Sequence, residues 1–263
     1  MIEISHLRIV YPGSQGNDEA VRDVSLQVKD GIITALVGES GSGKSTIAMA
    51  ILSLLPPGTA VSGNIRLGGK ELLGLTEEEL SAIRWEKIAL IPQGAMNSMT
   101  PVLSVGKQIR EVLSFHKGLH GEKARRETGE LLEKAGLDAS VAGRYPHELS
   151  GGQKQRATIA MALACDPSYL LADEPTTALD VITQGGIIST LSGIVKASGM
   201  GMLLITHDLP LATSVAAELY VMKDGRIEEH GPTEKVIGNP SGPHTRELIA
   251  ALTRMEGGYG NGN

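Results

Sequence analysis

The stretch Gly38-Glu-Ser-Gly-Ser-Gly-Lys44-Ser45 decides the fold of this chain. It matches the pattern G-x-x-x-x-G-K-[ST] in full, and this pattern marks a phosphate-binding loop when a strand precedes it and a helix follows. The apolar run Ile32–Val37 precedes the stretch, and the nearly apolar segment Ser45–Leu55 follows and stops at Pro56-Pro57. The sequence therefore predicts a buried strand, a phosphate-binding loop and a helix in succession.

The residue types in this loop suit a nucleotide. Glycines let the backbone approach phosphate groups closely, and the N-terminus of the following helix carries partial positive charge. We expect Lys44 to reach the β- and γ-phosphates and Ser45 to bind Mg²⁺. The predicted nucleotide-binding residues of the loop are Gly38, Glu39, Ser40, Gly41, Ser42, Gly43, Lys44, Ser45 and Thr46. The alternative is a glycine-rich turn that precedes Lys-Ser by chance.

A second motif is the apolar strand Tyr169–Ala172, which ends in the two acids Asp173 and Glu174. Two adjacent carboxylates are costly to bury at a strand end unless they serve a cation or a proton. We expect Asp173 to hold Mg²⁺ and Glu174 to polarise an attacking water, as a general base or a positioning group. The simpler interpretation is a pair of helix-capping acids, since Pro175 follows.

A third motif is Leu149-Ser-Gly-Gly-Gln153. Its Ser-x-x-Gln pattern is a capping box that predicts the start of a helix, which continues over Lys154–Ala164. Its two glycines also expose the helix N-terminus to an incoming anion. The two interpretations are compatible, so the motif indicates both a helix start and an anion-binding site.

Composition excludes several classes of protein. The chain has 263 residues and a net charge of −6, and we expect no nucleic-acid partner because phosphate neutralisation needs clustered Lys and Arg. The one cysteine, Cys165, is too few for a disulfide, a zinc site or an iron–sulfur cluster, and it follows the apolar run Ile159–Ala164 as a buried thiol would. We also expect no secretory leader and no span of the roughly 18–20 apolar residues that cross a bilayer.

Together the three motifs resemble the ATP-binding subunits of ABC transporters, over about residues 2–250. The quintet at 149–153 is that family's signature. The resemblance implies an α/β fold, with a P-loop NTPase core on a parallel sheet, an N-terminal antiparallel β subdomain and an inserted α-helical subdomain. It implies one nucleotide-binding domain over residues 1–240, with the helical subdomain at about 95–155, and a short C-terminal tail over 241–263.

The resemblance assigns roles to further residues. Tyr11 matches the aromatic residue that stacks on adenine, and Gln93 matches the glutamine that touches Mg²⁺ and the attacking water. Asp180 matches the loop that crosses the dimer, and His207 matches the histidine that contacts the γ-phosphate. Each also has a simpler interpretation, respectively an edge-strand residue, a polar loop residue, a helix cap and a turn histidine. The signature residues that would bind the partner's ATP are Ser150, Gly151, Gly152 and Gln153.

The resemblance also implies partners. ATP would lie between the P-loop of one subunit and the signature of a second ATP-binding subunit, in a head-to-tail dimer that is favoured to be a heterodimer, although a homodimer is possible. The assembly would include two transmembrane permease subunits and, indirectly, an extracytoplasmic solute-binding protein. The chain would then sit peripherally on the cytoplasmic face of the inner membrane.

Four segments resemble the dipeptide, oligopeptide and nickel importers: Asn97–Ile109, Tyr145–Gly152, Ala172–Gln184 and Asn239–Arg246. No cysteine follows Cys165, so the cysteine-rich iron–sulfur tail of many peptide cassettes is missing and we expect no iron–sulfur cluster. Peptides are the preferred cargo, with nickel or a metal chelate as the alternative. Non-transport ABC ATPases, P-loop kinases or GTPases, and an inactive cassette are less favoured.

Overall fold

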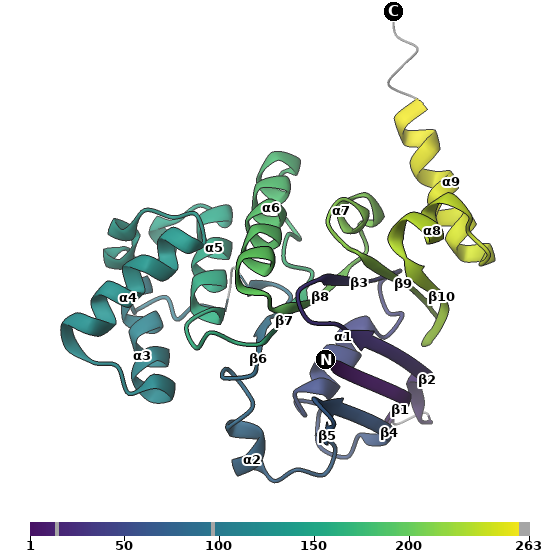
Figure 1. Cartoon of the computed structure of the whole chain (residues 1–263), viewed down its shortest axis with the longest axis horizontal. Helices are drawn as coiled ribbons and strands as arrows, with labels where there is room; N and C mark the ends of the chain where they lie inside the picture. The colour runs from purple at the N-terminus through teal and green to yellow at the C-terminus, as the bar shows by residue number, and fades with distance from the viewer. Residues whose placement is uncertain (14–15, 96–97, 258–263) are drawn as a thin grey trace, which may run out of the picture. The chain divides into compact units, whose positions relative to one another are not determined.

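The computed structural model describes residues 1–13, 16–95 and 98–257 (Figure 1). The chain forms two compact units. The first comprises Met1–Lys29, Ile33–Gly74 and Leu204–Asn263, and the second comprises Asp30–Ile32 and Leu75–Leu203. Because the second unit is inserted between parts of the first, residues far apart in the sequence meet within each unit.

The first unit contains an antiparallel sheet in the order β2-β1-β4-β5. Its strands are β1 (Ile2–Tyr11), β2 (Asp18–Val28), β4 (Ala60–Leu67) and β5 (Lys70–Glu71). Ile2, Ile4, Leu7 and Ile9 of β1 are all buried, as expected where one face of a sheet covers a core. The predicted N-terminal antiparallel β subdomain is confirmed.

The first unit also holds three further strands beside short helices. β3 (Ile33–Gly38) pairs in parallel with β9 (Glu218–Lys223), which pairs antiparallel with β10 (Arg226–Pro232). All six residues of β3 are buried, as the sequence predicts for a strand covered on both faces. The helices of this unit are α1 (Lys44–Ile51), α7 (Leu209–Thr213), α8 (Thr233–Gly238) and α9 (Pro243–Gly257). Helix α9 occupies the segment in which the sequence indicated only a short tail.

The second unit combines a parallel strand pair with most of the longer helices. β6 (Ile88–Ile91) pairs in parallel with β7 (Tyr169–Asp173). Every residue of β7 is buried. Its α-helices are α2 (Glu77–Ser81), α3 (Val105–Lys117), α4 (Gly121–Lys134), α5 (Gly151–Ala162) and α6 (Val181–Ser198). Two 3₁₀ turns, η2 (Ala139–Gly143) and η3 (Pro146–Glu148), lie between α4 and α5. β8 (Gly201–Thr206) contains the boundary of the two units.

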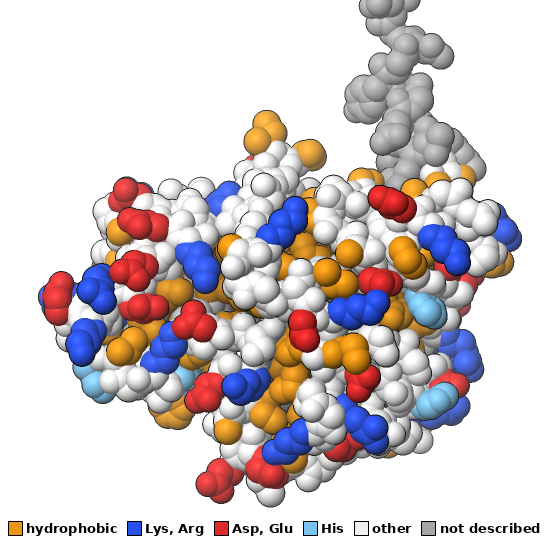
Figure 2. Space-filling model, viewed as in Figure 1, with side chains coloured by type: hydrophobic (Ala, Val, Ile, Leu, Met, Phe, Trp, Pro, Cys, Tyr) orange, Lys and Arg blue, Asp and Glu red, His pale blue; other side chains and the backbone are white. Residues whose placement is uncertain are grey.

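Local signals set the helix starts. Ser150 forms the predicted capping box with Gln153, and Thr76 forms another with Glu79. Helix α4 buries one face and exposes a charged one, and Figure 2 shows acidic and basic side chains interspersed over α3 and α4. Over the described ranges, the chain has no helix that is both long and apolar enough to span a bilayer.

Trp85, the single tryptophan of the sequence, lies between α2 and β6. Its backbone is left-handed, with a φ of 71°, and its N–H donates to the carbonyl of Ile88 at 2.9 Å. The indole lies 5.8 Å from the ring of His116, between centroids. A left-handed bulky residue persists only where its surroundings hold it, so the start of β6 is firmly fixed.

Candidate nucleotide-binding site

The phosphate-binding loop connects β3 to α1 in the first unit. Gly41 and Gly43 adopt φ values of 81° and 100°, which glycine reaches without strain. A Cβ atom on Gly38 would overlap the carbonyl oxygen of Met222 in β9, and one on Gly43 would overlap that of Ala20 in β2. The loop therefore lies against two strands and has no room for side chains at Gly38 and Gly43.

Lys44 lies inside the loop, with 4% of its surface exposed. Its Nζ donates to the carbonyls of Gly38 at 2.8 Å and Glu39 at 2.7 Å, and to the Ser42 hydroxyl at 3.3 Å. A buried ammonium is costly unless hydrogen bonds compensate it, and these bonds do so. The loop thus concentrates one positive charge where an anion would enter.

Helix α1 begins without a side-chain cap. Its N-cap residue is Gly43, which has no side chain to accept from the first-turn amides. Uncapped N–H groups at a helix N-terminus attract an anion, and the helix dipole adds to the attraction. Tyr11 lies beside this helix, since its hydroxyl donates to the Thr46 hydroxyl at 3.3 Å. The loop and α1 together suit a phosphate group, and Tyr11 lies beside α1.

In the second unit, β7 ends at Asp173, whose side chain is buried, and the chain turns at Glu174 with a φ of 46°. The Glu174 carboxylate accepts from the Gln93 amide at 3.1 Å and from the Thr177 hydroxyl at 2.9 Å, both at Oε2. The structure therefore brings together Gln93 and Glu174, which the sequence separates widely. It adds Thr177, which sequence reasoning missed although its spacing of three residues from Glu174 is a turn signal.

The signature residues lie at the start of α5, and three of them, Ser150, Gly152 and Gln153, line a pocket of about 590 Å³ in the second unit. The Ser150 hydroxyl accepts from the Gln153 N–H at 3.3 Å, and the Gln153 side chain accepts from the Ser150 N–H at 3.0 Å. A Cβ atom on Gly152 would lie 2.6 Å from the Thr183 methyl group, so the start of α5 packs closely on α6. Arg156, which sequence reasoning missed, lines the same pocket and bonds to Thr190 at 2.8 Å.

Asp180 caps α6, as its simpler interpretation as a helix cap predicted. Its carboxylate accepts from the Thr183 hydroxyl at 2.7 Å and from the Thr183 N–H at 2.9 Å. These bonds, the hydroxyl first, hold the pKa of Asp180 below its usual range. The next two residues, Val181 and Ile182, are 82% and 89% exposed. They form a small exposed apolar pair at the start of α6.

His207 follows β8 in the first unit and is exposed. The next residue, Asp208, caps α7 by accepting from the Leu211 N–H at 2.9 Å. His207 therefore lies where a strand ends and a short helix begins. This is the kind of position at which α/β proteins hold ligand-contacting residues.

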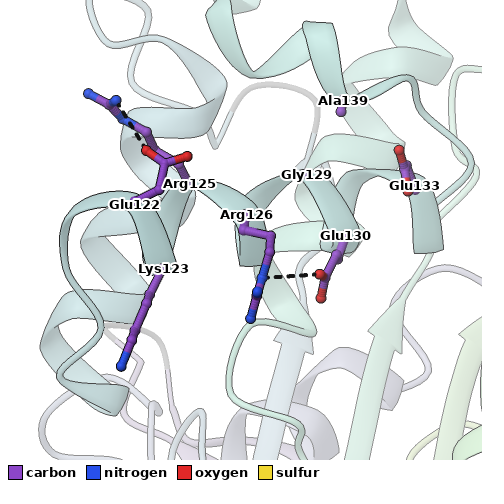
Figure 3. A pocket seen from close by; sticks show the side chains of 8 residues that line it. All are labelled: Glu122, Lys123, Arg125, Arg126, Gly129, Glu130, Glu133 and Ala139. Atoms are coloured by element: carbon purple, nitrogen blue, oxygen red, sulfur yellow. Dashed lines mark ion pairs between the residues drawn. The ribbon is translucent and has the colours of Figure 1, made fainter.

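A pocket of about 500 Å³ along α4 lies outside these groups (Figure 3). Arg125 pairs with Glu122 at 3.5 Å, and Arg126 pairs with Glu130 at 3.6 Å. Figure 3 shows these pairs along one helix, with the Lys123 side chain directed away from them. Exposed pairs of this kind contribute little and neutralise one another, so the pocket lacks the charge that a nucleotide would need.

The sequence profile described as ABC transporter matches residues 21–177. A putative peptide import ATP-binding protein of Brucella abortus is 43% identical over 97% of this chain and 78% of its own length. An oligopeptide transport ATP-binding protein of Bacillus subtilis is 40% identical over 97% of this chain and 73% of its own. A peptidoglycan transport ATP-binding protein of Agrobacterium fabrum is 43% identical over 97% of this chain and 48% of its own.

Solved structures are similar over most of the chain. A dimeric ATP-binding cassette in a post-hydrolysis state, bound to ADP and phosphate, superimposes with a TM-score of 0.80 and 31% identity. The match covers 89% of this chain and 99% of that one. A component of an ABC transporter complex from Clostridium perfringens gives a TM-score of 0.78 with 26% identity, over 97% of this chain and 96% of that one. The predicted α/β cassette fold is confirmed.

Proposed function

The chain belongs to the ABC transporter family, and from that premise we propose that it is the ATP-hydrolysing subunit of a peptide importer. The observation that carries the proposal is the loop that encloses Lys44 beside the uncapped helix α1. The relatives named for peptide and oligopeptide transport, at 40–43% identity, support a peptide cargo. Nickel or a metal chelate is the alternative cargo.

The phosphate-binding loop holds the nucleotide in this proposal. Its backbone N–H groups and the first turn of α1 bind the phosphates, and Lys44 redirects its ammonium from the loop carbonyls to phosphate oxygens. Tyr11 stacks on the adenine, and its bond to Thr46 at 3.3 Å supports that position beside α1.

The residues assigned to Mg²⁺ fit a hard cation. Ser45, Gln93 and Asp173 offer hydroxyl, amide and carboxylate oxygens, which are the donors that Mg²⁺ prefers. When bound, Mg²⁺ neutralises charge that develops on the β- and γ-phosphates during transfer. The carboxylate of Asp173 ends a buried strand, so its orientation is fixed before a cation arrives.

Hydrolysis depends on Glu174, which orients a water and accepts its proton. Gln93 and Thr177 both donate to Oε2 of this carboxylate, and these two bonds hold it in place. His207 contacts the γ-phosphate. Phosphoryl transfer needs mainly positioning and electrostatic stabilisation, and these are the contributions that fixed polar side chains make.

A head-to-tail dimer completes the site. The signature residues Ser150–Gln153 bind the ATP of a second subunit, which we favour as a homologous chain, and Asp180 lies in the connecting loop. The exposed Val181 and Ile182 support an interface there. The dimer works with two permease subunits at the cytoplasmic face of the inner membrane, and through them with a solute-binding protein.

The test is turnover by purified chain with its permease subunits in vesicles. Glu174→Gln should retain bound ATP, lose hydrolysis by about a hundredfold or more and abolish peptide uptake. Glu130→Gln is the matched control, because Glu130 pairs with Arg126 on the exposed face of α4. Undiminished hydrolysis in Glu174→Gln would contradict the catalytic assignment, and ATP-driven uptake of nickel rather than peptide would contradict the cargo.

A further inference from the structure

His244 is buried without a hydrogen bond. It lies in the first turn of α9, with 2% of its surface exposed. Among the described residues, neither ring nitrogen has a hydrogen-bond partner. A buried imidazole that leaves both nitrogens unsatisfied is unfavourable, so its position calls for a physical explanation.

Two carboxylates of β10 fix the start of α9 and so the place of this ring. Glu228 accepts from the backbone N–H groups of His244 and Thr245, each at 3.1 Å. Glu229 accepts from the backbone of Ser241 at 2.8 Å and of Gly242 at 2.9 Å. Partial burial alone raises the pKa of Glu229, but these bonds outweigh it and lower the pKa to about 2. The helix start is thus held firmly, and the imidazole is directed inward.

Each ring nitrogen faces a different carboxylate. Nε2 lies 4.0 Å from Oε1 of Glu39, the second residue of the phosphate-binding loop, and Nδ1 lies 3.7 Å from Oε2 of Glu247 on α9. Both glutamate side chains are largely exposed, so a small rotation closes either distance at little cost. A neutral imidazole can donate to one of them, and a doubly protonated one can donate to both.

Glu39 connects this ring to the nucleotide site. The backbone carbonyl of Glu39 accepts from the Lys44 ammonium at 2.7 Å. Its side chain points toward His244, so restraint of the side chain limits how far that carbonyl can shift. A contact between His244 of α9 and the Glu39 side chain therefore affects the position of the Lys44 ammonium, which the loop encloses.

We propose that His244 is a positioning residue for the phosphate-binding loop, which holds Glu39 through Nε2 and links the docking of α9 to nucleotide affinity. The inference rests on the proposed ATP-binding role of the loop. It assigns a function to the C-terminal segment. This segment contains neither the family signature nor the catalytic acids.

The test compares variants of the full chain by calorimetric titration with the ATP analogue adenylyl imidodiphosphate and Mg²⁺. His244→Ala should weaken binding by about fivefold, as the loss of one net hydrogen bond predicts. His244→Gln should restore most of the affinity, because a glutamine amide reaches the position of Nε2. His244→Asn should not, because its amide reaches only the position of Nδ1, on the side of Glu247.

A double-mutant cycle identifies the partner. If His244 acts through Glu39, His244→Ala should have no further effect in a Glu39→Ala chain. His230→Ala is the matched control, because His230 lies in the same unit and stacks on Tyr220, 5.1 Å away between ring centroids. Its affinity for the analogue should equal that of the unmodified chain.

The outcomes are distinguishable. Unchanged affinity in His244→Ala, or equal losses in the Gln and Asn variants, would overturn the inference and leave His244 as a core residue. Thermal unfolding of each variant identifies a loss of affinity that merely follows a loss of folded protein, which would also overturn it. Failure of the unmodified chain to bind the analogue would instead contradict the proposed function.

Discussion

The phosphate-binding loop and the signature region both present a helix N-terminus behind glycines, but they differ in what satisfies that N-terminus. Helix α1 has no side-chain cap, whereas α5 is capped by Ser150 and α6 by Asp180. Lys44 is enclosed by its loop, whereas Val181 and Ile182 extend into solvent. The difference supports the proposal that the first region binds an anion within one chain and that the second acts when another chain covers it.

The strongest test of this comparison removes the enclosed charge. Lys44→Ala should weaken ATP binding by the isolated chain about a hundredfold or more, because several charge-assisted bonds to phosphate are lost. Lys154→Ala, in the first turns of α5, is the matched change in the signature region and should leave that affinity unchanged. Equal losses in the two variants, measured by calorimetric titration, would show that the regions do not differ as described.

A second test compares glycines. Gly38→Ala should lower the free energy of unfolding by about 1–3 kcal/mol, because the new methyl group overlaps the Met222 carbonyl. Gly185→Ala on α6 meets no atom within 4 Å and should instead raise it, by up to about 1 kcal/mol, since alanine favours a helix. Urea denaturation measures both. A Gly38→Ala chain of unchanged stability would mean that the loop is less tightly packed than the contacts indicate.

A third test addresses the exposed residues of the second region. Ile182→Ser should weaken ATP-dependent dimerisation about tenfold, since burial of an isoleucine side chain contributes about 1.5–3 kcal/mol. Stability and ATP affinity of the single chain should not change, because Ile182 is 89% exposed. Sedimentation of the Glu174→Gln chain with its partner ATP-binding subunit and ATP, with and without Ile182→Ser, provides the measurement. Equal dimerisation would exclude this residue from the interface.

The smallest expected effect concerns the cap of α5. Ser150→Ala should cost about 1 kcal/mol of unfolding free energy, because the bond to the Gln153 N–H is lost. ATP affinity of the single chain should remain the same, since this helix lies outside the phosphate-binding loop. Thermal unfolding and titration together check both parts, and a large loss of affinity would contradict the separation of the two regions.

Features that depend on neighbours in sequence were predictable. The residue patterns correctly indicated the strand before Gly38, the capping box at Ser150 and the strand that ends at Asp173. The position of each feature is determined by interactions between residues that are close in the sequence, so it can be predicted from one sequence.

Features that depend on distant residues were not predictable. The bond between Gln93 and Glu174 joins the end of β6 to the end of β7, and no local pattern encodes it. The start of α9 is bound by Glu228 and Glu229 of β10, which accept from backbone N–H groups of residues 241–245. The sequence indicated a tail there, because local composition omits the carboxylates that the fold supplies.

Trp85 has an optical consequence. The chain has only this indole, and it belongs to the second unit, where its strained backbone holds it near His116. Light that excites indole and not phenol therefore produces emission from the second unit alone. The first unit does not emit under this excitation. The protein thus carries a single intrinsic indole, Trp85, whose emission reports on the second unit without any added label.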